Sequence, residues 1–198
     1  QEKINAAQPW GVASRERATI LRRTADLFED HAEEFFALLT QEAGKTLPDC
    51  IGELREAVDF LRYYACQSEV LSDAEAGVFT CISPWNFPLA IFTGQIAAAL
   101  AAGNAVLAKP AENTSMIAYL ATQLMHEAGV PAAALHLIAG EGPKLGARLC
   151  SSDKITGVCF TGSTKTAQTI NRLMARHLPP HIPLIAETGG LNAMIVDS

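Results

Sequence analysis

The sequence lacks any concentration of positive charge. Its 15 lysine and arginine residues are outnumbered by 21 aspartate and glutamate residues, which gives a net charge of −6. The nearest approach to a basic cluster, between Arg15 and Arg23, is interleaved with Glu16 and is typical of a solvated helix face. An acidic chain without a basic face is not expected to bind nucleic acid, and we expect no such partner through this segment.

Cysteine is scarce and shows no paired spacing. There are five cysteines, an odd number, and they are widely spaced in mostly apolar contexts: Cys50, Cys66, Cys81, Cys150 and Cys159. No CxxC motif and no nearby pair of histidines accompanies them, so the spacing favours neither a disulfide framework nor a metal site. We expect reduced, buried thiols in a cytoplasmic protein, and no bound metal.

Long apolar runs are also missing. The longest near-apolar segment, 89–102, is broken by Thr93, Gly94 and Gln95, and it is shorter than the roughly 20 residues that span a bilayer. The polar N-terminal residues do not follow the charged-then-apolar order of an export signal. The sequence therefore predicts no membrane span and a cytoplasmic location.

What the chain does have is enough apolar sequence for a substantial core. Of its 198 residues, 49% are hydrophobic and 18% are charged, which excludes a disordered chain. From residue 14 to about residue 67 the pattern is helical, because Leu54, Val58, Leu61 and Ala65 recur with helical spacing. We expect amphipathic helices interrupted at Gly44 and at Pro48, in an N-terminal helical segment, 1–76.

Short apolar runs alternate with helical patterns in the remainder, 77–198. This alternation predicts right-handed βαβ crossovers and a Rossmann-like, open parallel α/β sheet with helices on both faces. Helical residues 1–76 would pack on this domain, and ligands would bind at the carboxyl ends of its strands. The predicted strands are 78–82, 105–108, 135–138, 157–160, 184–186 and 193–196.

An asparagine stands between two prolines in Ser83-Pro84-Trp85-Asn86-Phe87-Pro88. The prolines fix φ and push the residues before them toward extended backbone, so Asn86 is held on a stiff turn between a strand and a helix. An amide held there can donate a hydrogen bond to a developing oxyanion. The alternative is an ordinary strand-to-helix turn without chemistry.

Lys109 and Glu112 follow the predicted strand 105–108. At a strand end both side chains could reach a ribose, with the carboxylate accepting from its hydroxyls and repelling a 2′-phosphate. This arrangement predicts a preference for a ribose with a free 2′-hydroxyl over one that carries a 2′-phosphate. The alternative is a surface pair in which Glu112 only favours the positive end of a helix dipole.

Two glycine-containing loops follow later strands. Gly140-Glu141-Gly142-Pro143-Lys144-Leu145-Gly146 is close to a dinucleotide fingerprint, but its last glycine comes one residue late. In Phe160-Thr161-Gly162-Ser163-Thr164 a hydroxyl stands beside free N–H groups at a helix start, which suits a pyrophosphate. The alternative for Ser163 is ordinary helix capping.

A carboxylate ends the apolar stretch Ile185-Ala186-Glu187-Thr188-Gly189-Gly190. The two glycines would let a ligand approach the backbone, and Glu187 would be placed as a general base. The alternative is a loop glutamate hydrogen-bonded to neighbouring amides.

Taken in order, the motifs at 84–88, 109–112, 160–164 and 187–190 resemble the signature of NAD(P)-dependent aldehyde dehydrogenases, and the resemblance covers essentially the whole chain. Ala167 departs from it, standing where many members have glycine. Glu-Thr-Gly-Gly at 187–190, together with residues 77–92, is most similar to members that oxidise L-glutamate γ-semialdehyde to L-glutamate in proline catabolism, as one module of a bifunctional enzyme.

The resemblance implies roles for individual residues. Asn86 would donate to the oxyanion formed when a cysteine thiolate attacks the aldehyde, and Glu187 would activate the water that hydrolyses the thioester. NAD would be the cofactor of this chain, while FAD would belong only to a separate proline dehydrogenase domain outside it. The implied cofactor-binding residues are Ile82, Ser83, Pro84, Trp85, Lys109, Glu112, Gly142, Gly146, Phe160, Thr161, Gly162, Ser163 and Gly189.

One requirement of the family is not met within the chain. The family's nucleophilic cysteine follows the Glu187 motif, whereas all five cysteines here precede it. We therefore expect the coenzyme-binding part of a longer enzyme, inactive by itself, whose catalytic domain would follow Ser198 and which would form a homo-oligomer when complete. The alternatives are a dehydrogenase for another aldehyde and a non-catalytic nucleotide-binding or structural module of the same fold.

Overall fold

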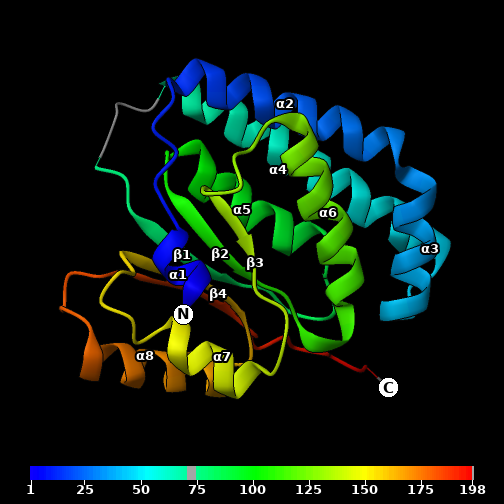
Figure 1. The fold of residues 1–198 in the computed structure, drawn as a ribbon. Helices are drawn as coiled ribbons and strands as arrows, with labels where there is room; N and C mark the ends of the chain where they lie inside the picture. The colour runs from blue at the N-terminus through cyan, green and yellow to red at the C-terminus, as the bar shows by residue number, and fades with distance from the viewer. Residues whose placement is uncertain (71–74, 198) are drawn as a thin grey trace.

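A five-stranded, all-parallel sheet organises the chain in the computed structural model, which describes residues 1–70 and 75–197. The strands run in the order β3-β2-β1-β4-β5 (Figure 1). This order, with β1 in the middle, is that of the Rossmann-like fold, and it confirms the predicted fold class. The strands are β1 (Val78–Ile82), β2 (Ala105–Lys109), β3 (Leu135–Leu137), β4 (Gly157–Gly162) and β5 (Leu184–Thr188).

Helices cover both faces of this sheet (Figure 1). One face carries α2 (Ser14–Asp30), α3 (Ala32–Ala43), α4 (Leu47–Val70), α5 (Ala90–Ala101) and α6 (Ser115–Ala128). The other face carries α1 (Glu2–Ala6), α7 (Gly142–Leu149) and α8 (Thr164–His177), and a 3₁₀ turn, η1 (Glu112–Thr114), precedes α6. Within the described residues no helix is both long enough and apolar enough to cross a lipid bilayer.

The two faces of the sheet bury two separate hydrophobic cores. Along β2, Val106 and Ala108 face the core under α2–α6, while Ala105 and Leu107 face the core under α1, α7 and α8. All five residues of β2 are buried, as expected for an inner strand of a parallel sheet with helices on both faces. Helices α2 and α4 therefore belong to the same core as β1, β2 and α5.

The predicted helix breaks are only half right. Gly44 ends α3 in the left-handed conformation, with φ 64°, as expected for a helix-terminating glycine. Pro48, in contrast, lies in the first turn of α4, where its missing N–H has no intrahelical partner to lose. A further break, not predicted, separates α2 from α3 at His31.

Two other expectations were wrong. Residues 193–196 form no strand: no neighbouring strand pairs with them in the described structure, and the side chains of Met194 and Ile195 are 90% and 91% exposed. Cys66 is exposed on α4, because its helix position faces away from the core. All five cysteines are free, as expected, and Cys50, Cys81 and Cys150 are buried.

Candidate functional site

The predicted site residues converge on one edge of the sheet. The loop with Asn86 follows β1, and Lys109 is the last residue of β2. Gly142 and Ser163 follow β3 and β4, and Glu187 is the second-last residue of β5. All strands are parallel, so these positions share the carboxyl edge. The chain continues from β1 to β2 on one side and later adds β4 on the other side of β1. The space just beyond the carboxyl ends of β1 and β4 is therefore the expected ligand crevice of such a sheet.

A cavity of about 730 Å³ opens at this edge between α7 and α8. Its volume is that of a pocket for a small molecule or cofactor. Four predicted cofactor residues line it: Ile82, Lys109, Gly142 and Gly146. The structure adds a group that the sequence analysis missed, on α7 and on one stripe of α8: Pro143, Ala147, Lys165, Thr166, Thr169, Ile170, Arg172, Leu173 and Arg176.

Small residues on α7 make room for this cavity. A Cβ at Gly146 would meet no atom within 4 Å, so this position opens onto empty space. A Cβ at Gly142 would stand 3.2 Å from Glu112 Oε1 and 3.8 Å from Lys109 Nζ. Glycine at residue 142 therefore lets the α7 backbone approach the charged pair that follows β2.

Lys109 and Glu112 lie at the same end of the cavity but in different environments. Lys109 is buried, and its Nζ donates a 2.9 Å hydrogen bond to the carbonyl of Pro110. Burial lowers the pKa of Lys109, and the charge of Glu112 opposes this effect. Glu112 is exposed, and its Oε1 accepts a hydrogen bond from the backbone N–H of Gly142. This bond links the loop after β2 to the start of α7.

Ser163 is the N-cap of α8. Its Oγ accepts a 3.2 Å hydrogen bond from Thr166 N and lies 2.9 Å from Thr166 Oγ1. The capping alternative is thus realised in the structure. A cap satisfies only one of the four free N–H groups at a helix start, so capping and anion binding at this terminus are compatible.

A side chain from α5 links the ends of the paired strands β1 and β4. Gln95 Nε2 donates to the carbonyl of Ile82 at 3.3 Å and to Thr161 Oγ1 at 3.0 Å. These two bonds hold the carboxyl ends of the two strands together. Thr161 was predicted to contact the cofactor, and in the structure its hydroxyl accepts this hydrogen bond from within the protein.

Ser83, the residue after β1, carries a buried hydroxyl without a partner. Its backbone N–H donates to the carbonyl of Lys109 at 3.2 Å, but its Oγ makes no hydrogen bond to any described residue. Buried polar atoms are normally satisfied, so an orphaned hydroxyl at the crevice suits a polar ligand group. The orphaned hydroxyl and the helix start at Ser163 both follow strands at the edge of the sheet where the cavity opens.

The loop that carries Asn86 is open to solvent. Trp85 and Phe87 are 59% and 43% exposed, and among residues 1–70 and 75–197 none is hydrogen-bonded to the Asn86 side chain. Glu187 is likewise exposed, on β5, in register with Thr161 of β4. One strand separates β1 from β5, which corresponds to about 10 Å across the sheet.

None of the five cysteines is placed as a nucleophile beside Asn86. Cys81 of β1 and Cys159 of β4 are paired in register within the sheet, before its carboxyl edge. Cys81 is buried and points its Sγ toward the carbonyl of Gln95, 3.7 Å away. A hydrogen bond with Cys159, together with burial, raises the pKa of Cys81, and the same bond lowers the pKa of Cys159.

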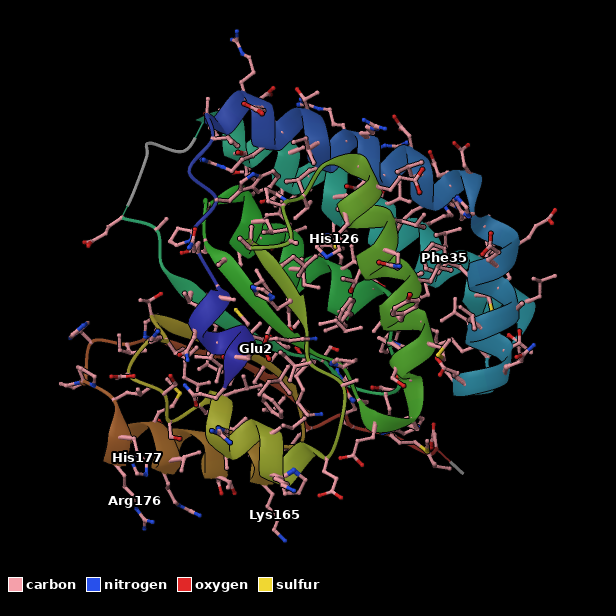
Figure 2. The ribbon with its side chains drawn as sticks, viewed as in Figure 1. Glu2, Phe35, His126, Lys165, Arg176 and His177 are labelled. Carbon is pink, nitrogen blue, oxygen red and sulfur yellow. The ribbon has the colours of Figure 1, made fainter. Side chains whose placement is uncertain are left out.

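Basic residues of α8, among them Lys165 and Arg176, lie at the α8 side of the cavity. Figure 2 shows Lys165, Arg176 and His177 projecting from α8 away from the sheet. Lys165 and Arg176 also line the cavity, so they stand at its rim. Such a rim attracts anionic ligands. No group of three or more potential ligands that could hold a metal ion lies within the described part of the chain.

The fold and the site define an α/β protein of the Rossmann-like class with a candidate nucleotide crevice at the carboxyl edge of its sheet. Residues 3–198 match the model of the family described as "Aldehyde dehydrogenase family". The chain belongs to the aldehyde dehydrogenase family.

Individual members of the family are similar to this chain to different extents. Over its full length the chain is 53% identical to the bifunctional protein PutA of Salmonella typhimurium, but it covers only 16% of that protein. A mutant of proline utilization A from Bradyrhizobium japonicum superposes with a TM-score of 0.93 at 48% identity, over 99% of this chain and 22% of that one. The 1-pyrroline-5-carboxylate dehydrogenase from Thermus, solved with bound NAD, gives a TM-score of 0.82 at 31% identity, over 91% of this chain and 39% of that one.

Proposed function

We propose that this chain is the coenzyme-binding part of an NAD-dependent dehydrogenase that oxidises L-glutamate γ-semialdehyde to L-glutamate in proline catabolism. The observation that carries the proposal is that Asn86, Lys109, Ser163 and Glu187 all lie at or just after strand ends on one edge of the sheet, where Lys109 lines a cavity of about 730 Å³. The names of the relatives supply the substrate class. The chain spans about a sixth of the PutA that it matches, so the activity belongs to the proposal.

The proposed NAD contacts divide along the crevice. Lys109 and Glu112 would hold the adenine ribose, and the start of α8 with Ser163 would hold the pyrophosphate. Trp85 would line the cleft, and the missing side chain of Gly142 would let NAD approach the backbone at the start of α7. NAD, when bound, supplies the acceptor for the hydride that leaves the substrate. In this proposal FAD serves only a separate proline dehydrogenase domain outside this chain.

The proposed catalytic residues act at different moments. The Asn86 side-chain N–H donates to the oxyanion that forms when a thiolate attacks the aldehyde carbon. Glu187 then removes a proton from the water that attacks the thioester carbonyl. We place the attacking thiolate outside these 198 residues, because no cysteine follows Glu187 and none of the five cysteines lies beside Asn86.

Two further properties belong to the same proposal. The complete enzyme is a homo-oligomer, as the family resemblance implies. It works in the cytoplasm, a location that the five free thiols support, because reducing compartments keep cysteines unpaired.

Stopped-flow measurement of NADH formation by the complete protein tests these roles. Asn86→Ala removes a donor used while the oxyanion develops, so the first turnover should slow by about 10²- to 10³-fold, the usual loss for one oxyanion donor. Glu187→Gln should preserve the first turnover, because the base acts later. It should leave a burst of NADH followed by a slow steady state as the acyl-enzyme accumulates.

The matched control is Asn5→Ala, which removes an exposed amide from α1 that accepts from Gln1 and bonds to none of the proposed site residues. It should change neither kinetic phase. The proposal fails if Glu187→Gln abolishes the burst together with the steady state while Asn86→Ala leaves both intact.

A further inference from the structure

Helix α5, which follows the Asn86 loop, has no cap of its own. Its N-cap residue is Leu89, and no side chain of the helix start makes a capping hydrogen bond. A helix leaves its first four N–H groups without intrahelical partners, and asparagine is among the best residues for accepting from them. Between Pro84 and Phe92, Asn86 is the only residue whose side chain carries a hydrogen-bond acceptor. By local sequence alone, Asn86 would be the cap.

A glutamate from α4 takes that position instead. Glu53 Oε1 accepts from the N–H of Leu89 at 2.8 Å and from the N–H of Ala90 at 3.3 Å. Glu53 is 3% exposed, so this is a buried charged cap rather than a surface contact. Charge-assisted hydrogen bonds to backbone N–H groups are stronger than neutral ones. Glu53 therefore occupies the donors that an asparagine three residues upstream would otherwise use.

A lysine completes the arrangement. Lys45 Nζ lies 2.6 Å from Glu53 Oε2, and the two side chains are 13% and 1% exposed, so the buried carboxylate has a counter-ion. The same ammonium lies 4.4 Å from the ring centroid of Phe87, within the range of a cation–π contact. One ion pair thus contacts the residue immediately after Asn86 and the first N–H groups of α5.

We propose that the Glu53–Lys45 ion pair positions the oxyanion donor, by capping α5 so that the Asn86 amide stays free and by fixing Phe87 beside it. This inference rests on the proposed function, in which Asn86 is the donor. It agrees with the exposed Asn86 side chain, which has no hydrogen-bond partner in the described structure. In this proposal Glu53 and Lys45 are positioning residues, which act through Asn86.

The test is a double-mutant cycle on the NADH burst of the complete protein. Glu53→Ala frees the two N–H groups, Asn86 turns to cap them, and the burst rate falls by tenfold or more, toward the 10²- to 10³-fold loss of Asn86→Ala. The affinity for NAD, measured by titration, should stay within about twofold of the wild type. The double variant Glu53→Ala/Asn86→Ala should be no slower than Asn86→Ala alone, since residues acting through one group are not additive. Glu53→Gln, which keeps an acceptor, should restore most of the rate.

Glu42 offers a matched control from the same part of the fold. Its two carboxylate oxygens accept from Met116 N at 3.0 Å and from Ile117 N at 2.9 Å, so it caps α6 as Glu53 caps α5. Glu42→Ala removes the same kind of helix cap yet should leave the burst rate within about twofold, because no oxyanion donor precedes α6. If Glu53→Ala is not recovered folded, Lys45→Met replaces it, and its loss should also vanish in the Asn86→Ala background.

The outcomes separate the two proposals. If Asn86→Ala does not slow the burst, the proposed function of Asn86 is wrong, and the positioning role is overturned with it. If Asn86→Ala slows the burst but the effect of Glu53→Ala multiplies with it in full, Glu53 supports the fold only, and the positioning role alone is overturned. A drop in the burst for Glu42→Ala equal to that for Glu53→Ala would overturn it as well.

Discussion

Replacing Glu112 by glutamine should narrow the preference for NAD over NADP without disturbing the loop that carries it. The carboxylate of Glu112 accepts from the backbone N–H of Gly142, and a glutamine carbonyl can accept from the same N–H. The substitution therefore removes the negative charge and keeps the hydrogen bond between the loop and α7. What changes is the repulsion of a 2′-phosphate and the strength of the bond to a ribose hydroxyl.

The exposure of Glu112 sets the size of this effect. For a solvated pair of unit charges about 4 Å apart the interaction is about 1 kcal/mol, and a phosphate monoester carries about 1.5 to 2 charges. The repulsion is therefore about 1.5 to 2 kcal/mol. Since about 1.4 kcal/mol corresponds to tenfold in rate, the ratio of kcat/KM for NAD over NADP should fall roughly 10- to 30-fold.

The assay is steady-state kinetics of the complete protein with both cofactors at low ionic strength. Glu127→Gln is the control, because Glu127 is an exposed carboxylate near the other end of α6, about 20 Å along the helix and beyond the Debye length of about 8 Å. It changes the net charge equally but should leave the ratio unchanged. An unchanged ratio in Glu112→Gln, or an equal fall in both variants, would refute the assignment of Glu112 to the ribose.

Four further measurements follow from the geometry. The pKa of Lys109 is lowered by burial, so the unfolded chain binds more protons between that pKa and the ordinary value of about 10.4. In this pH window the free energy of unfolding of the wild type should rise relative to that of Lys109→Met. Urea midpoints that change equally with pH in the two proteins would contradict this. Exposed Cys66 should react with N-ethylmaleimide well before Cys150, because burial raises the pKa of Cys150 to about 12. Peptide mass spectrometry at successive times would follow the two reactions. Simultaneous labelling would show that Cys150 is accessible. Gly52→Ala, whose Cβ meets nothing within 4 Å, should raise the free energy of unfolding by up to about 1 kcal/mol. Gly142→Ala, crowding a carboxylate 3.2 Å away, should weaken NAD binding, and calorimetric titration that finds equal affinities would exclude this.

The sheet was predictable because its strands are short apolar runs that alternate with helical patterns. The ends of these strands were less predictable. Thr161 and Glu187 lie outside the predicted strands, yet they pair in register at the ends of β4 and β5. Backbone pairing with a neighbour, which composition does not report, extends these strands. Residues 193–196 are apolar but have no neighbouring strand to pair with in the described structure, so they form no strand.

The candidate site divides in the same way. Each predicted loop does reach the carboxyl edge, since a parallel sheet brings all strand ends together. The caps from Glu53 and Glu42 could not be foreseen, because they lie 36 and 74 positions from the N–H groups that they meet. The α8 stripe that lines the cavity did carry a signal: Thr166, Ile170 and Leu173 have helical spacing toward one side.

The core beneath α2–α6 has a consequence for how the chain unfolds. Phe28, Leu61 and Leu100, from three helices, bury their side chains in one cluster with Val106 of the sheet. Separating α2, α3 and α4 from the rest of the chain would expose this cluster and leave the starts of α5 and α6 without the carboxylates of Glu53 and Glu42. We expect the slowest hydrogen-exchanging amides of α4 and β2 to open together, as parts of one cooperative unit rather than as a domain and its appendage.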